Sequence, residues 1–132
     1  IRTIGDLERV GDYAVNLTEY AELLKNFNEK FTNDLLFEVE HLRETIASLY
    51  QSTMKAYMDQ DFAALDDVNK YEDEVDDTVA TIEKLHLQRL MDGIYPASVG
   101  QVYQEFASDT ERIADHFLNV AKSIRQLHVG ED

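Results

Sequence analysis

Two segments of the sequence place a glutamate four residues before an aspartate within an amphipathic pattern: DLERVGDYAVNL near the start and DTERIADHFLNV near the end. The first contains Glu8 and Asp12, and the second contains Glu111 and Asp115. On a helix, residues four apart project side by side, with about 5–6 Å between their Cβ atoms. Because two such carboxylates repel each other, they need a positive partner. A nearby arginine is one candidate, and a divalent or trivalent metal ion suits carboxylate oxygens better.

A third acidic pair lies in the segment YEDEVDD, where Glu72 and Asp76 have the same spacing. The sequence between this pair and the last one contains Gly93–Pro96, which predicts a tight turn between two antiparallel helices. In such a hairpin Glu72 lies opposite Asp115, and Asp76 lies opposite Glu111. We therefore expect four carboxylates at one level of the hairpin, forming a metal site. Possible extra ligands at its edges are Asp73, Asp77 and Asp109.

The first and last segments align without a gap and share five identical polar positions, which chance likeness of amphipathic helices does not explain. Their apolar positions also match in kind: Val10 with Ile113, Leu17 with Val120, and Leu24 with Leu127. A repeat spaced by roughly one hundred residues indicates duplication of a multi-helix unit. The Glu8–Asp12 pair has no evident partner pair in this sequence. We expect it to form half of a second metal site, completed by an upstream helix or by a second copy of the chain.

The elements that must position these side chains are predicted to be helices, because apolar residues recur at spacings of three and four throughout. Asp61 is the predicted N-cap of the third helix, and Gly93 is predicted to end it with a positive φ. Short connections make sequential helices antiparallel, so the fold class is an all-α, up-down bundle of four long helices. The expected helices are Thr3–Asn26, Asn33–Met58, Phe62–Met91 and Ala97–His128.

Composition limits the possible functions. The chain has 132 residues, with 27 acidic against 12 basic side chains and a net charge of −15. Such a surface repels nucleic acid and anionic membranes and attracts cations. No cysteine is present, which excludes disulfides and thiolate ligands, and no apolar run approaches the roughly 20 residues that span a bilayer. Because the sequence opens on Ile1 rather than Met, we expect a fragment of something longer.

The segment LERVGD within DLERVGDYAVNL is similar to the signature helix of the PhoU family, and DTERIADH resembles a divergent second copy. The Glu72–Asp76 pair resembles the other acidic motif of that family. The resemblance implies two three-helix bundles, each ending in a signature helix. Residues 1–132 then form one PhoU-like domain that lacks its first two helices, with residues 1–26 ending the first repeat and residues 31–128 forming the second. Thr110 and Ala114 replace the leucine and glycine of the signature.

The resemblance also implies a function. PhoU proteins hold metal clusters of iron, zinc or magnesium on paired Glu-x-x-x-Asp motifs, which here are Glu72–Asp76, Glu111–Asp115 and Glu8–Asp12. They act as regulators of phosphate uptake and signalling rather than as enzymes. The start of this chain looks like the PhoU-like tail of a sodium/phosphate cotransporter. The expected partners are a membrane phosphate transporter, or its own transmembrane portion, and a second copy of the chain. The expected place is the cytoplasmic face of the membrane, without insertion.

Two other interpretations stay open at this stage. A ferritin-like di-metal oxidase would use Glu38-x-x-His41 and Glu83-x-x-His86, although Glu38 and His41 flank the apolar seam and are expected to be exposed. The other alternative is a metal-free interaction bundle. His116 and His128 are lone histidines, for which a surface position is favoured over metal ligation.

Overall fold

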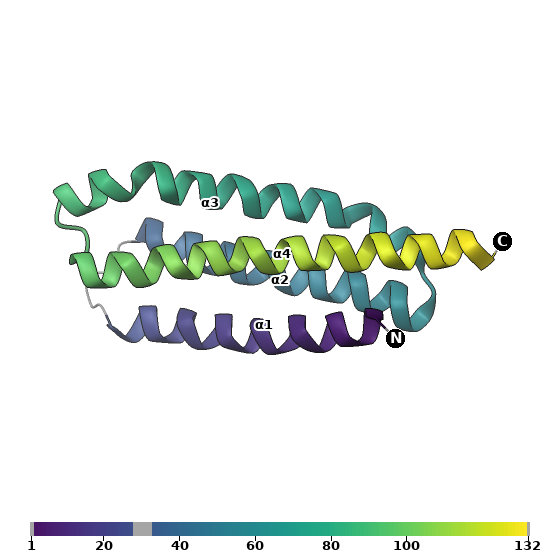
Figure 1. The fold of residues 1–132 in the computed structure, drawn as a ribbon. Helices are drawn as coiled ribbons and strands as arrows, with labels where there is room; N and C mark the ends of the chain where they lie inside the picture. Colours follow the sequence, from purple (N-terminus) through teal and green to yellow (C-terminus); the bar gives the residue numbers. More distant parts are fainter. Residues whose placement is uncertain (1, 28–32, 132) are drawn as a thin grey trace.

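The structure is a computed structural model that describes residues 2–27 and 33–131. It consists of four long helices and one short 3₁₀ helix, and the described residues contain no strand (Figure 1). The all-α prediction is therefore confirmed. The elements are α1 (Arg2–Phe27), α2 (Asn33–Asp59), η1 (Phe62–Asp67), α3 (Val68–Met91) and α4 (Ala97–Glu131).

The long helices run up and down along one common direction, and α4 lies against each of the other three. The start of α1 and the end of α4 lie at one end of the bundle, and the α3–α4 turn lies at the other (Figure 1). Within the described part of the chain, no helix carries an apolar stretch that would reach across a bilayer.

Apolar seams at helical spacing hold the bundle together. Large aromatic and aliphatic side chains of α4 are fully buried, including Tyr103, Phe106 and Phe117, and Leu24 of α1 is 1% exposed. Each such side chain contributes about 1.5–3 kcal/mol by leaving water. The predicted inward position of Leu127 is wrong, because this side chain is 59% exposed. Figure 1 gives the reason: the last turns of α4 extend beyond the ends of the neighbouring helices.

The connection between α2 and α3 differs from the prediction. Gln60 adopts φ 55°, and Asp61 makes no side-chain capping hydrogen bond. Instead the backbone N–H of Ala64 donates to the Asp61 carbonyl at 3.2 Å, which is the bonding pattern of a 3₁₀ turn. The Asp61 carboxylate pairs with Lys55 at 3.4 Å. The predicted third helix therefore begins as η1, and Asp61 is not its side-chain cap.

The turn between α3 and α4 matches the prediction and fixes how these helices pair. Gly93 has φ +70°, which an L side chain rarely adopts. Its N–H donates to the Leu90 carbonyl at 3.2 Å, and the N–H of Ile94 donates to the Arg89 carbonyl at 2.9 Å. These two bonds form a Schellman motif. The turn thereby sets the level at which each residue of α3 faces α4.

Candidate metal centre

Four carboxylates converge where α3 faces α4. The Glu72 carboxyl lies within hydrogen-bonding reach of Asp76 on its own helix and of Asp115 on α4. The Glu111 carboxyl lies within the same reach of Asp76. The hairpin thus places Glu72 beside Asp115 and Asp76 beside Glu111, which are the pairs expected from the turn position. Two Glu-x-x-x-Asp motifs on neighbouring helices form one cluster.

The electrostatics of this cluster are unfavourable for four ionised groups. Partial burial, followed by the neighbouring carboxyls of Asp76 and Asp115, raises the pKa of Glu72 from 4.5 to about 7. Partial burial also raises the pKa of Glu111, with further contributions from the negative charges of Asp76, Glu83 and Asp115. Each of these causes disfavours the charged form. The arrangement therefore favours either bound protons or a bound cation.

The tightest part of this cluster lies on α3, and within the described residues neither Glu111 nor Asp115 belongs to a group of three metal-ligating side chains this close together. Carboxylate oxygens of Glu72, Asp73 and Asp76 all lie within 4.8 Å of one another. Asp73 is exposed at the edge of the cluster, whereas Glu72 and Asp76 are half-buried. Oxygen-only donors of this kind are the ligands that hard cations prefer.

Glu83 is a further member of this acidic face that lies outside the Glu-x-x-x-Asp pairs. Its charge contributes to the raised pKa of Glu111 on the facing helix. Glu83 lies seven residues, about two helical turns, after Asp76, so the two side chains share one face of α3. This spacing of seven residues is the sequence signal that places Glu83 on the same face as Asp76.

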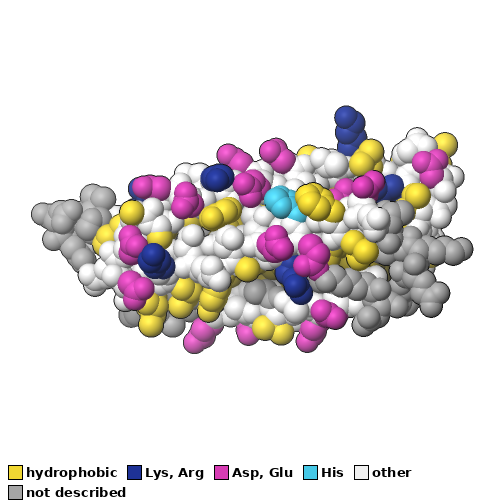
Figure 2. All heavy atoms as spheres, turned by 180° about the vertical axis from the view of Figure 1, so that it is seen from behind, with side chains coloured by type: hydrophobic (Ala, Val, Ile, Leu, Met, Phe, Trp, Pro, Cys, Tyr) yellow, Lys and Arg dark blue, Asp and Glu magenta, His cyan; other side chains and the backbone are white. Residues whose placement is uncertain are grey.

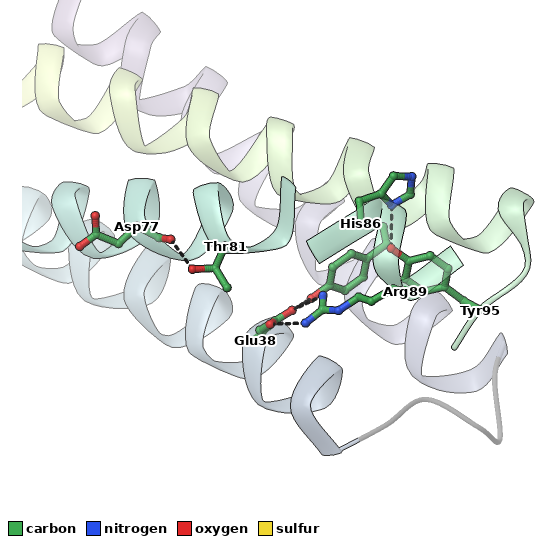
Figure 3. A network of polar contacts seen from close by, with 7 residues as sticks. Glu38, Asp77, Thr81, His86, Arg89 and Tyr95 are labelled. Atoms are coloured by element: carbon green, nitrogen blue, oxygen red, sulfur yellow. Dashed lines mark hydrogen bonds and ion pairs between the residues drawn. The ribbon is translucent and has the colours of Figure 1, made fainter. Parts of the chain in front are cut away.

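The other edge residues do not join the cluster. Asp109 pairs with Arg112 of its own helix at 3.7 Å. Asp77 is exposed, and its backbone carbonyl accepts a hydrogen bond from Thr81 at 3.1 Å (Figure 3). His116 stacks on Tyr13 of α1, with ring centroids 6.0 Å apart and planes inclined by 18°. His128 lies outside the residues whose side chains are described.

The stacked pair of Tyr13 and His116 also reveals how the two repeated helices are related. The two residues occupy equivalent positions in DLERVGDYAVNL and DTERIADHFLNV. Because α1 and α4 run in opposite directions, a local twofold axis passes between these two rings. The two copies of the repeated segment therefore lie antiparallel, with equivalent residues in contact.

The exposed face of α1 corresponds to a covered face of α4. Ala114 and Ala121 of α4 are 0% and 4% exposed, because α2 and α3 pack against this helix. Their equivalents on α1 are Gly11, which is half-buried, and Thr18, which is exposed, and Val15 beside them is 60% exposed. A groove of about 450 Å³ lies here between α1 and α2.

The Glu8–Asp12 pair does not reach the carboxylates of α3 and α4. Glu8, Arg9 and Asp12 are all exposed on α1, whereas the cluster lies between α3 and α4. Within the described residues, no group of three or more metal-ligating side chains includes Glu8 or Asp12. The pair remains half of a predicted site.

The signature departure at Ala114 has a simple structural account. Ala114 is completely buried on α4, so a methyl group fits at this contact. At Gly11, its equivalent on α1, an added Cβ would meet nothing within 4 Å. Neither position needs glycine for close approach in the described structure.

The ferritin-like interpretation requires Glu38 as a metal ligand, but this residue is buried and bonded to other side chains. Glu38 is only 9% exposed, so the expectation that it is exposed is wrong. Its two carboxylate oxygens accept hydrogen bonds from Arg89 at 2.8 and 2.7 Å, and Oε1 also accepts one from Tyr103 at 2.6 Å (Figure 3). His86 Nδ1 lies 2.6 Å from the Tyr95 hydroxyl. These contacts leave Glu38 paired with a guanidinium rather than available to a metal.

The surface around these sites is strongly acidic. Figure 2 shows acidic side chains scattered over the rear face, with few lysines and arginines among them. This distribution agrees with the net charge of −15. The acidic surface attracts cations to the whole molecule. The cluster on α3 and α4 differs from the rest of this surface because its carboxyl groups lie close to one another.

Comparison with known proteins identifies relatives. The sequence model described as "PhoU domain" matches residues 39–124. The chain is 27% identical over 127 residues to a protein of Thermotoga maritima named phosphate-specific transport system accessory protein PhoU homolog 1, covering 96% of this chain and 54% of that protein. It is 26% identical over 133 residues to a PhoU homolog of Clostridium acetobutylicum with the same accessory name, covering 99% of this chain and 58% of that protein.

A protein of Deinococcus radiodurans with that accessory name is 22% identical over 132 residues, covering 98% of this chain and 60% of its own length. The chain thus spans about half the length of the curated relatives it matches. No solved structure matched significantly. Since the family match covers more than half of the residues, from near the start of α2 to about two turns before the end of α4, the chain belongs to the PhoU domain family.

Proposed function

We propose that this chain is a regulatory, non-enzymatic domain of a phosphate transport or phosphate-signalling system, and that it binds metal ions through Glu72, Asp76, Glu111 and Asp115. The family match and the accessory proteins named above support the regulatory role. The convergence of the four carboxylates on α3 and α4 supports the metal site.

The chemistry of the donor set fits a hard cation. A metal ion between the helices would replace carboxylate repulsion by attraction and would lower the raised pKa of Glu72. Oxygen-only ligation favours magnesium or ferric iron over zinc, which is usually held by nitrogen and sulfur donors. Because the ligands come from both α3 and α4, binding would stabilise the folded hairpin by linkage.

The test of this site is elemental analysis of protein prepared without chelator, for the wild type and for a Glu111→Gln, Asp115→Asn double variant. We expect bound iron, magnesium or zinc in the wild type and a clear reduction in the double variant. A Glu44→Gln, Glu105→Gln double variant is the matched control, since it removes two exposed acidic charges, one from α2 and one from α4, that lie outside the proposed metal ligands. Equal metal content in all three proteins, or none in the wild type, would favour the metal-free interaction bundle.

The Glu8–Asp12 pair is proposed as half of a second site. It is equivalent to Glu111–Asp115 across the local twofold axis, and it lies on the exposed face of α1. A helix related by this axis to α3 would bring a second acidic pair to it. That helix would come from another part of the same protein or from a second copy of the chain.

The proposed partner is a membrane phosphate transporter, or a transmembrane portion of the same protein, at the cytoplasmic face of the membrane. The names of the relatives support an accessory role beside a transporter, and the cotransporter-tail alternative remains a proposal. A phosphate-starvation reporter strain that lacks its own accessory protein tests this role. We expect the chain, expressed with its natural flanking sequence, to restore repression in high phosphate. Unchanged reporter output with stable expression would contradict the role.

A further inference from the structure

A buried polar network joins three helices at the end of the bundle near the α3–α4 turn. Glu38 of α2 accepts hydrogen bonds from Arg89 of α3 and Tyr103 of α4. The three residues are 9%, 8% and 0% exposed. Figure 3 shows the guanidinium of Arg89 facing the carboxylate of Glu38 across the gap between α2 and α3.

The network continues to the turn itself. The ring of Tyr95 lies 6.2 Å from that of Tyr103, and its hydroxyl is 2.6 Å from His86 Nδ1. Gly100 lies directly beneath Tyr95, because a Cβ at this position would be 2.5 Å from a ring carbon. These polar residues therefore pack inside the end of the bundle that carries the α3–α4 turn, rather than on its surface.

Stability alone does not account for such a network. Taking a carboxylate and a guanidinium out of water has a large desolvation cost, which their mutual attraction only offsets when the geometry is good. Apolar residues of similar volume often give equal or greater stability at such positions. A polar group at a helix interface can instead specify register, at some cost in stability.

The apolar seams of this bundle leave register poorly specified. On α2 the buried seam alternates steps of four and three residues, and on α4 it does the same. A shift of α2 by seven residues, about 10 Å, would therefore again place apolar side chains against apolar side chains. The seam residues are Leu35, Val39, Leu42, Ile46, Leu49, Thr53 and Ala56 on α2, and Val99, Tyr103, Phe106, Thr110, Ile113, Phe117, Val120 and Ile124 on α4.

The connection at the other end of α2 does not prevent such a shift. The six residues of η1 rise by about 2 Å each as a 3₁₀ helix and would rise by about 3.3 Å each when extended. Their unwinding would supply about 8 Å, and fraying of the last turn of α2 would supply the remainder. The register of α2 at its distant end therefore needs a separate determinant.

We propose that Glu38, Arg89 and Tyr103 form a register lock, which holds α2 at one position along the α3–α4 hairpin. After a shift of seven residues toward the turn, Thr45 would occupy the place of Glu38. Thr45 donates its hydroxyl to the His41 carbonyl of its own helix at 2.7 Å and offers no charge to Arg89. The guanidinium would then be buried without its carboxylate, so the shifted state is excluded.

The test replaces the network by apolar residues in a Glu38→Leu, Arg89→Met, Tyr103→Phe triple variant. Because the chain has no cysteine, spin labels can be attached at Glu44→Cys on α2 and Asn69→Cys on α3, both of which are exposed. These positions lie at different levels of the bundle, so a shift of α2 toward the turn lengthens the distance between them. Double electron–electron resonance measures the distribution of this distance.

We expect the triple variant to stay helical and to show a second distance population, about 8–10 Å longer than that of the wild type. The matched control is Thr110→Val, which removes a buried hydroxyl bonded within α4 to the Phe106 carbonyl at 2.7 Å. This control is expected to keep one population. A triple variant with the single wild-type population would overturn the proposal. Loss of helical circular dichroism in the triple variant would also overturn it, because the network would then be required for folding rather than for register.

Discussion

Replacing Glu72 by glutamine should stabilise the metal-free protein at neutral pH. The pKa of Glu72 is raised from 4.5 to about 7, first by burial and then by Asp76 and Asp115. A carboxyl whose pKa is higher in the folded state contributes stability below its unfolded pKa, and this contribution is lost as the pH rises through its folded pKa. The metal-free wild type is therefore expected to lose stability between pH 4.5 and about 7 through this group.

The size of the effect follows from the shift. Each pKa unit corresponds to about 1.4 kcal/mol, which sets an upper limit of about 3–4 kcal/mol for a shift from 4.5 to about 7. Because Glu72 retains contact with solvent, screening reduces the expected gain to about 1–2 kcal/mol. In a domain of this length, that gain raises Tm by roughly 3–10 °C.

Urea denaturation of chelator-treated protein at pH 5 and pH 7.5 measures this effect. We expect Glu72→Gln to exceed the wild type at pH 7.5 and to differ little from it at pH 5. Glu105→Gln is the control, because it removes one exposed acidic charge from α4 outside the cluster. If Glu72→Gln and Glu105→Gln change the free energy of unfolding equally at both pH values, the reasoning about carboxylate repulsion is refuted.

Three further predictions concern the elements that position the site. Glu38→Ala leaves a buried guanidinium without its carboxylate and should cost about 3–5 kcal/mol in urea denaturation; a loss below about 1 kcal/mol would contradict the burial of that pair. Gly93→Ala forces an alanine to φ +70° and should lower the free energy of unfolding by about 1 kcal/mol, measured by calorimetry. In the same measurement Gly11→Ala, with open space around its Cβ, should raise it by about 0.5–1 kcal/mol. Gly100→Ala places a methyl group against Tyr95 and should lower stability by about 1–3 kcal/mol, while an unchanged Tm would show that this ring has room to move.

Much of the fold could be predicted because its determinants are local. The seams at spacings of three and four residues specify helices, and Gly93 specifies the α3–α4 turn through its positive φ. That turn fixes which carboxylates face each other, so the proximity of Glu72 and Asp115 could be predicted from the sequence alone. The helix bounds differ from the expected ones by at most three residues at each end, apart from η1.

The errors arise where tertiary contacts override local preference. Asp61 has the residue type of an N-cap, but its carboxylate pairs with Lys55 instead of capping the helix. Its backbone carbonyl accepts the hydrogen bond from the N–H of Ala64. Leu127 fits the seam of α4, but its side chain is 59% exposed, and in the described structure the last turns of this helix project past its neighbours (Figure 1). Glu38 has the residue type of a surface position, and only the distant Arg89 and Tyr103 make its burial possible. Separations of 51 and 65 residues carry no local signal.

The most direct measurement of the central claim is the Tm of the chelator-treated protein with and without added metal ions, at pH 7.5. Metal binding at Glu72, Asp76, Glu111 and Asp115 predicts that saturating magnesium or iron raises the Tm of the wild type and of the Glu44→Gln, Glu105→Gln control. It also predicts that the Tm of Glu111→Gln, Asp115→Asn stays unchanged by metal. An unchanged Tm of the wild type, or an equal rise in both double variants, would contradict a metal site between α3 and α4.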